Sequence, residues 1–190
     1  VFGQTVILVL IQIGGLGVVT VAAAVSLLSG KKISLMQRST MQDAISAPKV
    51  GGIVRLTRFI LKGTMLIEAA GAVLLLPVFL SDYGLKGIWM SVFHSISAFC
   101  NAGFDILGTT DHTFVSLTGY SRNIWLNIVI MLLIILGGIG FLTWEDFYTN
   151  KFKFKRYRMQ SKVILITTAI LIIAPAVFFF ACDFGNLPAG

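Results

Sequence analysis

Long apolar stretches alternate with short basic stretches along this chain. Three uncharged runs cover residues 1–30, 123–144 and 163–182, and a fourth, residues 63–80, carries a single charge, Glu68. A helix rises about 1.5 Å per residue, and the hydrocarbon core of a membrane is about 30 Å thick. Each run is long enough to cross a membrane if the fourth borrows length from the residues before it. We therefore predict four transmembrane helices.

A fifth apolar run, residues 87–104, is also uncharged, but the basic loops argue against a crossing there. Loops rich in Lys and Arg stay in the cytoplasm, so the basic segments 31–62 and 145–162 share one side of the membrane. The two predicted helices between them already return the chain to that side. A third crossing would break this parity. Residues 87–104 are thus predicted to form a re-entrant segment that enters from the outside and returns there.

The composition agrees with a membrane protein. Hydrophobic residues make up 56% of the 190 residues and charged residues 12%, which leaves more apolar surface than a soluble domain of this length could bury. The net charge of +7 comes largely from the basic loops beside the predicted spans. Those loops lack the interleaved aromatic side chains of a strand-binding groove, so the charge does not indicate nucleic-acid binding.

The re-entrant run changes character near its end. Residues 87–99 carry large apolar side chains at three- and four-residue spacing, as in a helix. The next segment, Cys100–Asp105, has small side chains, a glycine that can take positive φ, an aromatic residue and a terminal acid. After a short helix whose negative end points into the membrane, such a segment can direct backbone carbonyls at a dehydrated cation. The alternative is an ordinary loop in which Gly103 only eases a turn.

Two parts of the chain repeat one another at an offset of 123 residues. The recurring positions are Gly14, Gly15, Gly17 and Thr20 with Gly137, Gly138, Gly140 and Thr143, and Met36 and Gln37 with Met159 and Gln160. Agreement over both pieces indicates an internal repeat. The glycine clusters are interpreted as sites where helices pack closely through small residues.

The segment His94–Asp105, with the sequence HSISAFCNAGFD, resembles the second pore loop of the Trk/Ktr/HKT superfamily of potassium transporters almost letter for letter. Residues 12–17 (QIGGLG) are similar to an inner-end helix motif of this superfamily, and residues 137–141 (GGIGF) give a third match. The resemblance is in particular to the membrane subunit of bacterial Ktr systems. It spans essentially the whole chain.

Members of this superfamily consist of four repeats, each an outer helix, a pore loop and an inner helix, around a single pore. The resemblance implies an all-α integral membrane fold, with four transmembrane helices and one re-entrant pore loop in this chain. The chain is then expected to be less than half of a family member. The implied segments are an inner helix of a first repeat (1–30), a basic cytoplasmic linker (31–51), a complete repeat (52–144), a basic cytoplasmic loop (145–162), the outer helix of a third repeat (163–182) and a truncated extracellular end (183–190). Within the complete repeat, the outer helix is 52–80, the pore helix and filter 87–105 and the inner helix 123–144.

The resemblance implies potassium uptake across the bacterial cell membrane through a selectivity filter, with sodium as a coupling or stimulating ion. The residues expected to donate backbone carbonyls to potassium, as one quarter of the filter, are Cys100, Asn101, Ala102 and Gly103. Phe104 and Asp105 are expected to support them. No cofactor is expected in this chain. The implied partners are the lipid bilayer, a second copy of the full-length subunit and a cytoplasmic nucleotide-binding regulatory ring.

Two other functions stay open on the residues alone. A re-entrant loop also serves transporters and channels for other cations, and in a non-transporting assembly subunit the loop would only pack. An enzyme is not expected, because the sequence has no metal-ligand spacing, nucleophile elbow, phosphate loop or paired catalytic carboxylates.

Polar residues within and beside the apolar runs are given structural roles. Glu68 is expected to pair with Arg58 or Lys62, or to snorkel, near the inner face. His94 is expected to form a hydrogen bond to a neighbouring helix. Asp105 is either an ordinary exposed loop acid or an acid that attracts cations to the outer mouth.

Overall fold

The protein is helical throughout the part of the chain that the structure describes. A computed structural model describes residues 2–17, 36, 39, 53–108 and 115–183, and none of these residues forms a β-strand. The chain divides into two compact units, Val1–Gly138 and Ile139–Gly190. The α-helices of the first unit are α1 (Phe2–Leu16), α4 (Ile53–Tyr83), α5 (Lys86–Phe99) and α6 (Ile124–Gly138), and those of the second are α7 (Phe141–Asn150) and α8 (Met159–Asp183). The predicted helical class is confirmed.

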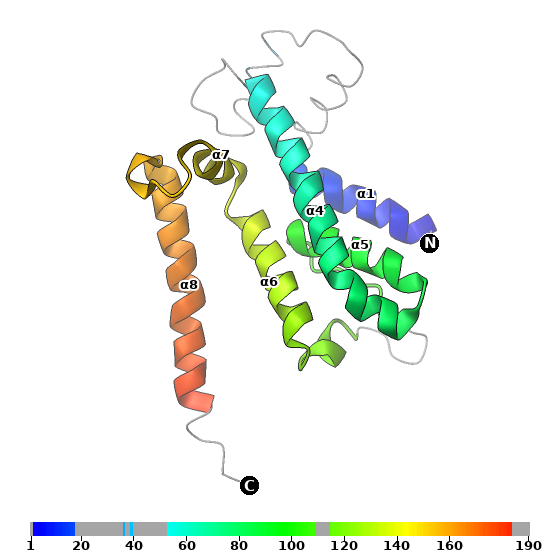
Figure 1. Cartoon of the computed structure of the whole chain (residues 1–190). Coiled ribbons are helices and arrows are strands. Elements are labelled where there is room, and N and C mark those ends of the chain that lie inside the picture. The colour runs from blue at the N-terminus through cyan, green and yellow to red at the C-terminus, as the bar shows by residue number, and fades with distance from the viewer. Residues whose placement is uncertain (1, 18–35, 37–38, 40–52, 109–114, 184–190) are drawn as a thin grey trace. The chain divides into compact units, whose positions relative to one another are not determined.

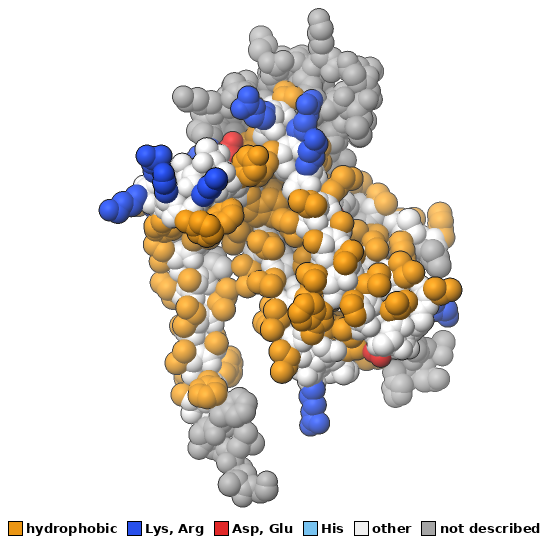
Figure 2. Space-filling view, viewed as in Figure 1, with side chains coloured by type: hydrophobic (Ala, Val, Ile, Leu, Met, Phe, Trp, Pro, Cys, Tyr) orange, Lys and Arg blue, Asp and Glu red, His pale blue; other side chains and the backbone are white. Residues whose placement is uncertain are grey.

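The long helix α4 covers the helix expected at residues 52–80, and it extends three residues further, to Tyr83. Its 31 residues include Pro77, which does not end it. Arg55, Arg58 and Lys62 in its first turns are exposed. Figure 2 shows basic side chains near this end of α4 and hydrophobic side chains over the rest of that face. This distribution suits a helix whose basic end lies beside a membrane.

The short helix α5 is enclosed by the other helices of its unit. It packs against α4 most extensively, and also against α6 and α1 (Figure 1). Phe93 on α5 and Phe79 on α4 are almost completely buried. At Gly87 a methyl group would overlap the carbonyl oxygen of Phe79, so a glycine is needed for the two helices to approach this closely. The helix predicted at residues 87–99 is thus the best-covered element of the unit.

The internal repeat is visible in the backbone. Helix α1 ends at Leu16 and is followed by Gly17 with φ +80°, and α6 ends at Gly138 and is followed by Gly140 with φ +82°. These two glycines are 123 residues apart in the sequence. A positive φ ends a helix and strongly favours glycine. The predicted inner helix 123–144 therefore stops at Gly138, and its last residues belong to α7. Residues 18–30 of the other predicted inner helix lie outside the described residues.

The second unit has its own polar cluster between α7 and α8. Arg158 forms an ion pair with Glu145 and a second one with Asp146, in which Arg158 Nε lies 3.5 Å from Asp146 Oδ1. Asp146 also accepts hydrogen bonds from the backbone N–H of Arg158 at 3.0 Å and from Ser161 Oγ at 2.6 Å. Because the buried Asp146 carboxylate is multiply bonded, it holds the start of α8 against α7. The segment predicted as a basic loop, 145–162, is therefore largely structured.

Two helices are long and apolar enough to span a membrane by themselves, Val54–Tyr83 and Met159–Cys182. The count rises to three if α6 and α7, which are separated by a short break, form one span. Helix α1, with 15 described residues, is apolar but shorter. Large apolar side chains are exposed along α8, as expected for a helix in contact with lipid or with further protein. The structure supports an integral membrane protein, and the number of four spans stays a prediction.

Candidate functional site

The chain reverses direction at the end of α5. The N–H of Ala102 donates to the carbonyl of Ser97 at 2.9 Å, and the N–H of Asn101 donates to the carbonyl of Ala98 at 3.1 Å. Asn101 has φ +55°. This pair of bonds around a left-handed residue is the Schellman motif, which satisfies the last carbonyls of a helix and turns the chain back. Asn is one of the few residues other than glycine that enter this conformation readily.

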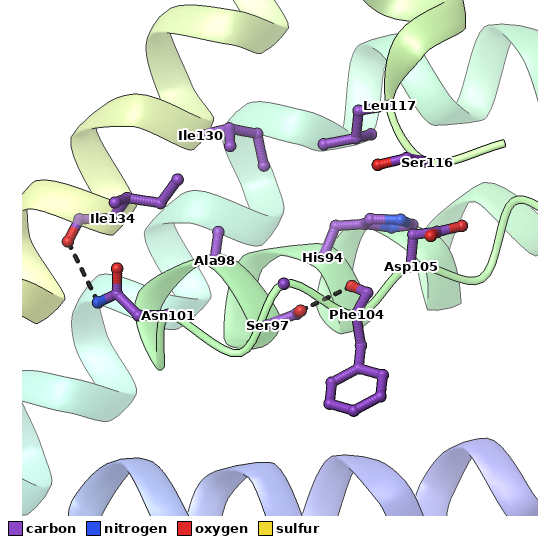
Figure 3. A pocket seen from close by; sticks show the side chains of 11 residues that line it. His94, Ser97, Ala98, Asn101, Phe104, Asp105, Ser116, Leu117, Ile130 and Ile134 are labelled. Atoms are coloured by element: carbon purple, nitrogen blue, oxygen red, sulfur yellow. Dashed lines mark hydrogen bonds between the residues drawn. The ribbon is translucent and has the colours of Figure 1, made fainter. Parts of the chain in front are cut away.

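The returning segment runs back alongside α5. The Ser97 hydroxyl donates to the carbonyl of Phe104 at 2.6 Å, which fixes Phe104 beside a residue seven positions earlier. Further along, Asp105 and His94 line the same cavity of about 210 Å³. Figure 3 shows the chain passing from Asn101 below Ser97 to Asp105 beside His94. Helix α5, with 14 residues, is about 21 Å long, and the segment after it returns along the same helix.

The four residues expected to form the filter begin within this turn, since Cys100 caps α5 and Asn101 is its left-handed residue. Among the described residues, no group donates a hydrogen bond to the carbonyls of Cys100, Asn101, Ala102 or Gly103. Gly103 is exposed and has φ +71°, and a methyl group built on it would meet nothing within 4 Å. The sequence thus yields a run of backbone carbonyls with no donor from the described residues, next to the negative end of α5.

The two predicted supporting residues have different surroundings. The Phe104 side chain is 56% exposed and points away from α5, toward the open groove beside α1 (Figure 3). The Asp105 carboxylate is half-buried and accepts a hydrogen bond from the N–H of Leu107 at 3.0 Å. Asp105 therefore braces its own loop, while the carbonyl of Phe104 is tied to Ser97.

The side chain of Asn101 adds a contact that its expected role as a carbonyl donor did not include. Its amide nitrogen lies 3.3 Å from the carbonyl of Ile134 on α6 and 3.4 Å from the carbonyl of Phe99. The first contact links the turn to the next helix, as Figure 3 shows. Asn101 thus combines a left-handed backbone with a donor to a neighbouring element.

Glycines of both repeated clusters pack against the same turn. A methyl group on Gly15 of α1 would lie 2.5 Å from the sulfur of Cys100 and 2.8 Å from its Cβ. A methyl group on Gly137 of α6 would overlap the carbonyl oxygen of Phe99. Both α1 and α6 therefore approach the end of α5 at a glycine. The interpretation of the clusters as close packing agrees with this geometry, which also identifies what they pack against.

The structural roles expected for His94 and Glu68 are wrong in their details. The ring nitrogen Nδ1 of His94 donates to the carbonyl of Met90 on its own helix, at 2.7 Å, and the ring stacks on Phe79 of α4. The Glu68 carboxylate accepts a hydrogen bond from Gln12 on α1 at 3.0 Å. Neither Arg58 nor Lys62 forms an ion pair with it in the described part of the chain. Glu68 is also only 7% exposed, so it does not snorkel.

The loop before α6 is anchored to the end of α4. The Tyr120 hydroxyl donates to the carboxylate of Asp82 at 2.7 Å. Burial and the neighbouring carboxylate raise the pKa of Tyr120 above its ordinary value, so the phenol keeps its proton and remains a donor. This bond holds the segment that follows the candidate site at a fixed distance from the helix that precedes it.

Ser97 is the main site residue that the sequence did not single out. It is one of several serines in a helix, and serine in a buried helix commonly bonds to its own backbone, as Ser91 does to the carbonyl of Gly87. Only the return of the chain brings the carbonyl of Phe104 within its reach. The seven-residue separation carries no periodic signal that would have revealed the contact.

Comparison with known proteins agrees with the motifs. Residues 1–171 match the family model TrkH, described as a cation transport protein. The chain is 38% identical over 186 residues to the potassium/sodium uptake protein NtpJ of Enterococcus hirae, covering 97% of this chain and 40% of the relative. It is 37% identical over 187 residues to the Ktr system potassium uptake protein B of Bacillus subtilis, covering 98% of this chain and 40% of the relative. The Ktr system potassium uptake protein D of the same organism is 30% identical over 193 residues, covering 99% and 42%.

These matches define a membrane transport protein rather than an enzyme. The chain belongs to the TrkH family of cation transport proteins. It is a multi-pass cell membrane protein, as its apolar helices also indicate. The chain spans about two fifths of the length of the relatives it matches.

Proposed function

We propose that the protein to which this chain belongs takes up potassium, and that Cys100–Gly103 contributes one quarter of its selectivity filter. The observation that carries this proposal is the reversal after α5, which leaves four consecutive carbonyls without donors among the described residues. The choice of potassium as the ion rests on the relatives, because the three described above are named as potassium or potassium/sodium uptake proteins. Potassium binding by rings of backbone carbonyls is an established means of selectivity.

The mechanism follows from the turn and the helix before it. Potassium sheds water against carbonyl oxygens of residues 100–103 and of three comparable loops outside this chain. The last turn of α5 contributes the partial negative charge of a helix C-terminus beside the ion. The bond between Ser97 and Phe104 holds the outer end of the segment, and the Schellman bonds hold the inner end. With a single glycine, instead of the two in Thr-Val-Gly-Tyr-Gly, weaker discrimination against sodium is expected.

The proposal includes a membrane topology. The segments are those implied by the family resemblance: four transmembrane helices, with residues 87–105 re-entrant from the outside and both basic segments in the cytoplasm. The reversal of the chain after α5 supports this topology, because the returning segment is tied back to Ser97 on the same helix.

Cysteine labelling tests the topology in the full-length protein. Lys86→Cys and Gly108→Cys should both react with a membrane-impermeant maleimide in intact cells, because both flank the re-entrant segment on the outside. Lys155→Cys should react only after the cells are permeabilised. Labelling of positions 86 and 108 from opposite sides would make residues 87–104 an ordinary crossing, and the filter assignment would be abandoned.

Growth on low potassium tests the transport proposal. Cells that lack their own potassium uptake should grow at low potassium, and accumulate the ion, when they express the full-length protein. The amount of protein in the membrane is measured in parallel by immunoblotting. Failure to restore growth or uptake by a protein that is present in the membrane would contradict the proposal.

A specific observation favours sodium as a second ion. The relative NtpJ is named as a potassium/sodium uptake protein. We therefore propose that sodium acts on this protein as a coupling or stimulating ion, a role that the single glycine of the filter segment permits. Uptake measured with either ion alone and with both together distinguishes potassium selectivity, coupling and transport of another cation.

The family resemblance also supplies partners for the full-length protein. We propose a homodimer that is gated by a cytoplasmic nucleotide-binding ring, with the basic segments as the docking surface. The word "system" in the names of two relatives is consistent with a membrane component that works with other subunits. No cofactor is proposed for this chain, and potassium is its cargo.

A further inference from the structure

Glu68 is an acidic residue in the middle of an apolar helix, and the proposed mechanism gives it no role. It is 7% exposed and lies on α4, one of the two helices long enough to span a membrane by themselves. Ionisable residues in such positions are costly and usually serve a function. The question is therefore what its carboxylate does.

The carboxylate faces the candidate filter. Its Oε2 atom accepts a hydrogen bond from Gln12 Nε2 at 3.0 Å, and its Oε1 atom lies 3.9 Å from the sulfur of Cys100. The same sulfur lies 3.9 Å from Gln12 Oε1. Both ends of the Gln12 amide are thus engaged, one with Glu68 and the other with the thiol of the first filter residue. Three elements, α1, α4 and the end of α5, meet at this point.

Two further contacts keep the three elements in register. The Ser95 hydroxyl on α5 donates to the backbone carbonyl of Glu68 at 2.7 Å. Trp89 Nε1 on α5 donates to the side chain of Gln4 on α1 at 3.0 Å. Gln4 and Gln12 border the buried Leu8 and Ile11 on one face of α1. The directional polar contacts therefore fix the position of α1 along α5, whereas the apolar contacts between the two helices only hold them together.

We propose that Glu68 and Gln12 form a polar bridge that positions Cys100, and with it the inner end of the filter segment. Glu68 is then a positioning residue for ion selectivity, and it acts through its hydrogen bond to Gln12 and its contact with Cys100. This inference rests on the proposed function for its transport readout. Without the bridge, the carbonyls that follow Cys100 lose the restraint from α1 and α4, and the Schellman bonds and the contact of Asn101 with α6 remain.

The first experiment measures potassium uptake by the full-length protein as a function of potassium concentration, with and without competing sodium. Glu68→Ala should raise the half-saturating potassium concentration about tenfold and reduce discrimination against sodium, as expected when a buried hydrogen bond is lost and the Gln12 amide is left without its partner. Glu68→Gln keeps an acceptor for Gln12 and should stay within about twofold of the unchanged protein. Met65→Ala, on the same helix with its side chain 72% exposed, is the control and should change neither quantity.

A double substitution tests whether the two residues act as one unit. If the bridge exists, Gln12→Ala combined with Glu68→Ala should be no worse than the more severe single change, because either one already breaks it. Multiplying effects would show that the residues act independently and would overturn the proposal. The proposal would also be overturned if Glu68→Ala lowered only the amount of protein in the membrane. The same holds if Glu68→Gln impaired potassium affinity and selectivity as much as Glu68→Ala does.

A second experiment does not depend on transport. The rate at which Cys100 reacts with a membrane-permeant maleimide is followed by peptide mass spectrometry, with the exposed Cys182 as an internal reference. Glu68→Ala should speed labelling of Cys100 about tenfold and leave Cys182 unchanged, because the thiol loses its contact with Glu68 and, with the bridge, its fixed position. If Cys100 reacts at the same rate in the unchanged protein and in Glu68→Ala, the bridge is overturned, whether or not the protein takes up potassium. Absence of potassium uptake alone contradicts only the proposed function.

Discussion

Replacement of Gly137 by alanine is expected to destabilise the protein more than replacement of any other glycine at the site by alanine. The new Cβ would overlap the carbonyl oxygen of Phe99 and lie 2.9 Å from its carbonyl carbon. Both atoms belong to the backbone at the end of α5, so neither can move away as a flexible side chain would. Relief requires α6 to shift, which also separates Asn101 from the carbonyl of Ile134. Overpacking of this kind costs about 3 kcal/mol or more.

The adjacent glycine provides a matched control. A methyl group on Gly138 would lie 4.0 Å from its nearest neighbour, the amide nitrogen of Asn101, which is an ordinary contact. Thermal unfolding of the purified full-length protein, and its yield in the membrane, should fall for Gly137→Ala and change little for Gly138→Ala. Equal stability of the two variants would mean that α6 does not approach the end of α5 as described.

Replacement of Gly103 by serine is expected to lower potassium-over-sodium selectivity about tenfold while leaving the protein in the membrane. The φ of +71° at this position costs a residue with a side chain about 1–2 kcal/mol. Since nothing lies within 4 Å of the added Cβ, the effect comes from the backbone and not from a clash. Relaxation toward negative φ rotates the carbonyls of Ala102 and Gly103, which are the proposed ligands. A tenfold change corresponds to about 1.4 kcal/mol.

Selectivity is measured as the ratio of potassium to sodium uptake at equal amounts of membrane protein. Gly119→Ser is the control, because Gly119 has equally open surroundings but no positive φ. An unchanged ratio for Gly103→Ser, at normal expression, would count against residues 100–103 as the filter. A fall for both variants would indicate a general disturbance of the fold.

The helices that could be predicted from the sequence are those with a strong and continuous apolar signal. The helix expected at residues 52–80 is α4, and the helix expected at 87–99 is α5, which begins one residue earlier. Hydropathy could not predict the end of α6 at Gly138, because the apolar run continues to Trp144. The break depends on a positive φ at Gly140, and a glycine within an apolar run is equally compatible with a continuous helix.

The candidate site was predicted as a segment but not as a set of contacts. The motif singled out Cys100–Gly103, and the role of these residues as a filter stays a prediction. The bonds that shape it join Ser97 to Phe104 and Gln12 to Glu68. Glu68 was expected to pair with a basic residue on its own helix, since such a pair is visible in the sequence. Its true partner is 56 positions away.

The sequence by itself determined that this is a helical membrane protein with an internal repeat and one irregular segment within an apolar run. These properties depend on hydropathy and periodicity averaged over many residues, so they can be predicted without knowing how the side chains pack. Only the tertiary structure decided which polar side chains meet around Cys100 and which glycines allow α1 and α6 to approach the end of α5. Such contacts are few, short-ranged and directional, and they arise only after the apolar surfaces have brought distant segments together.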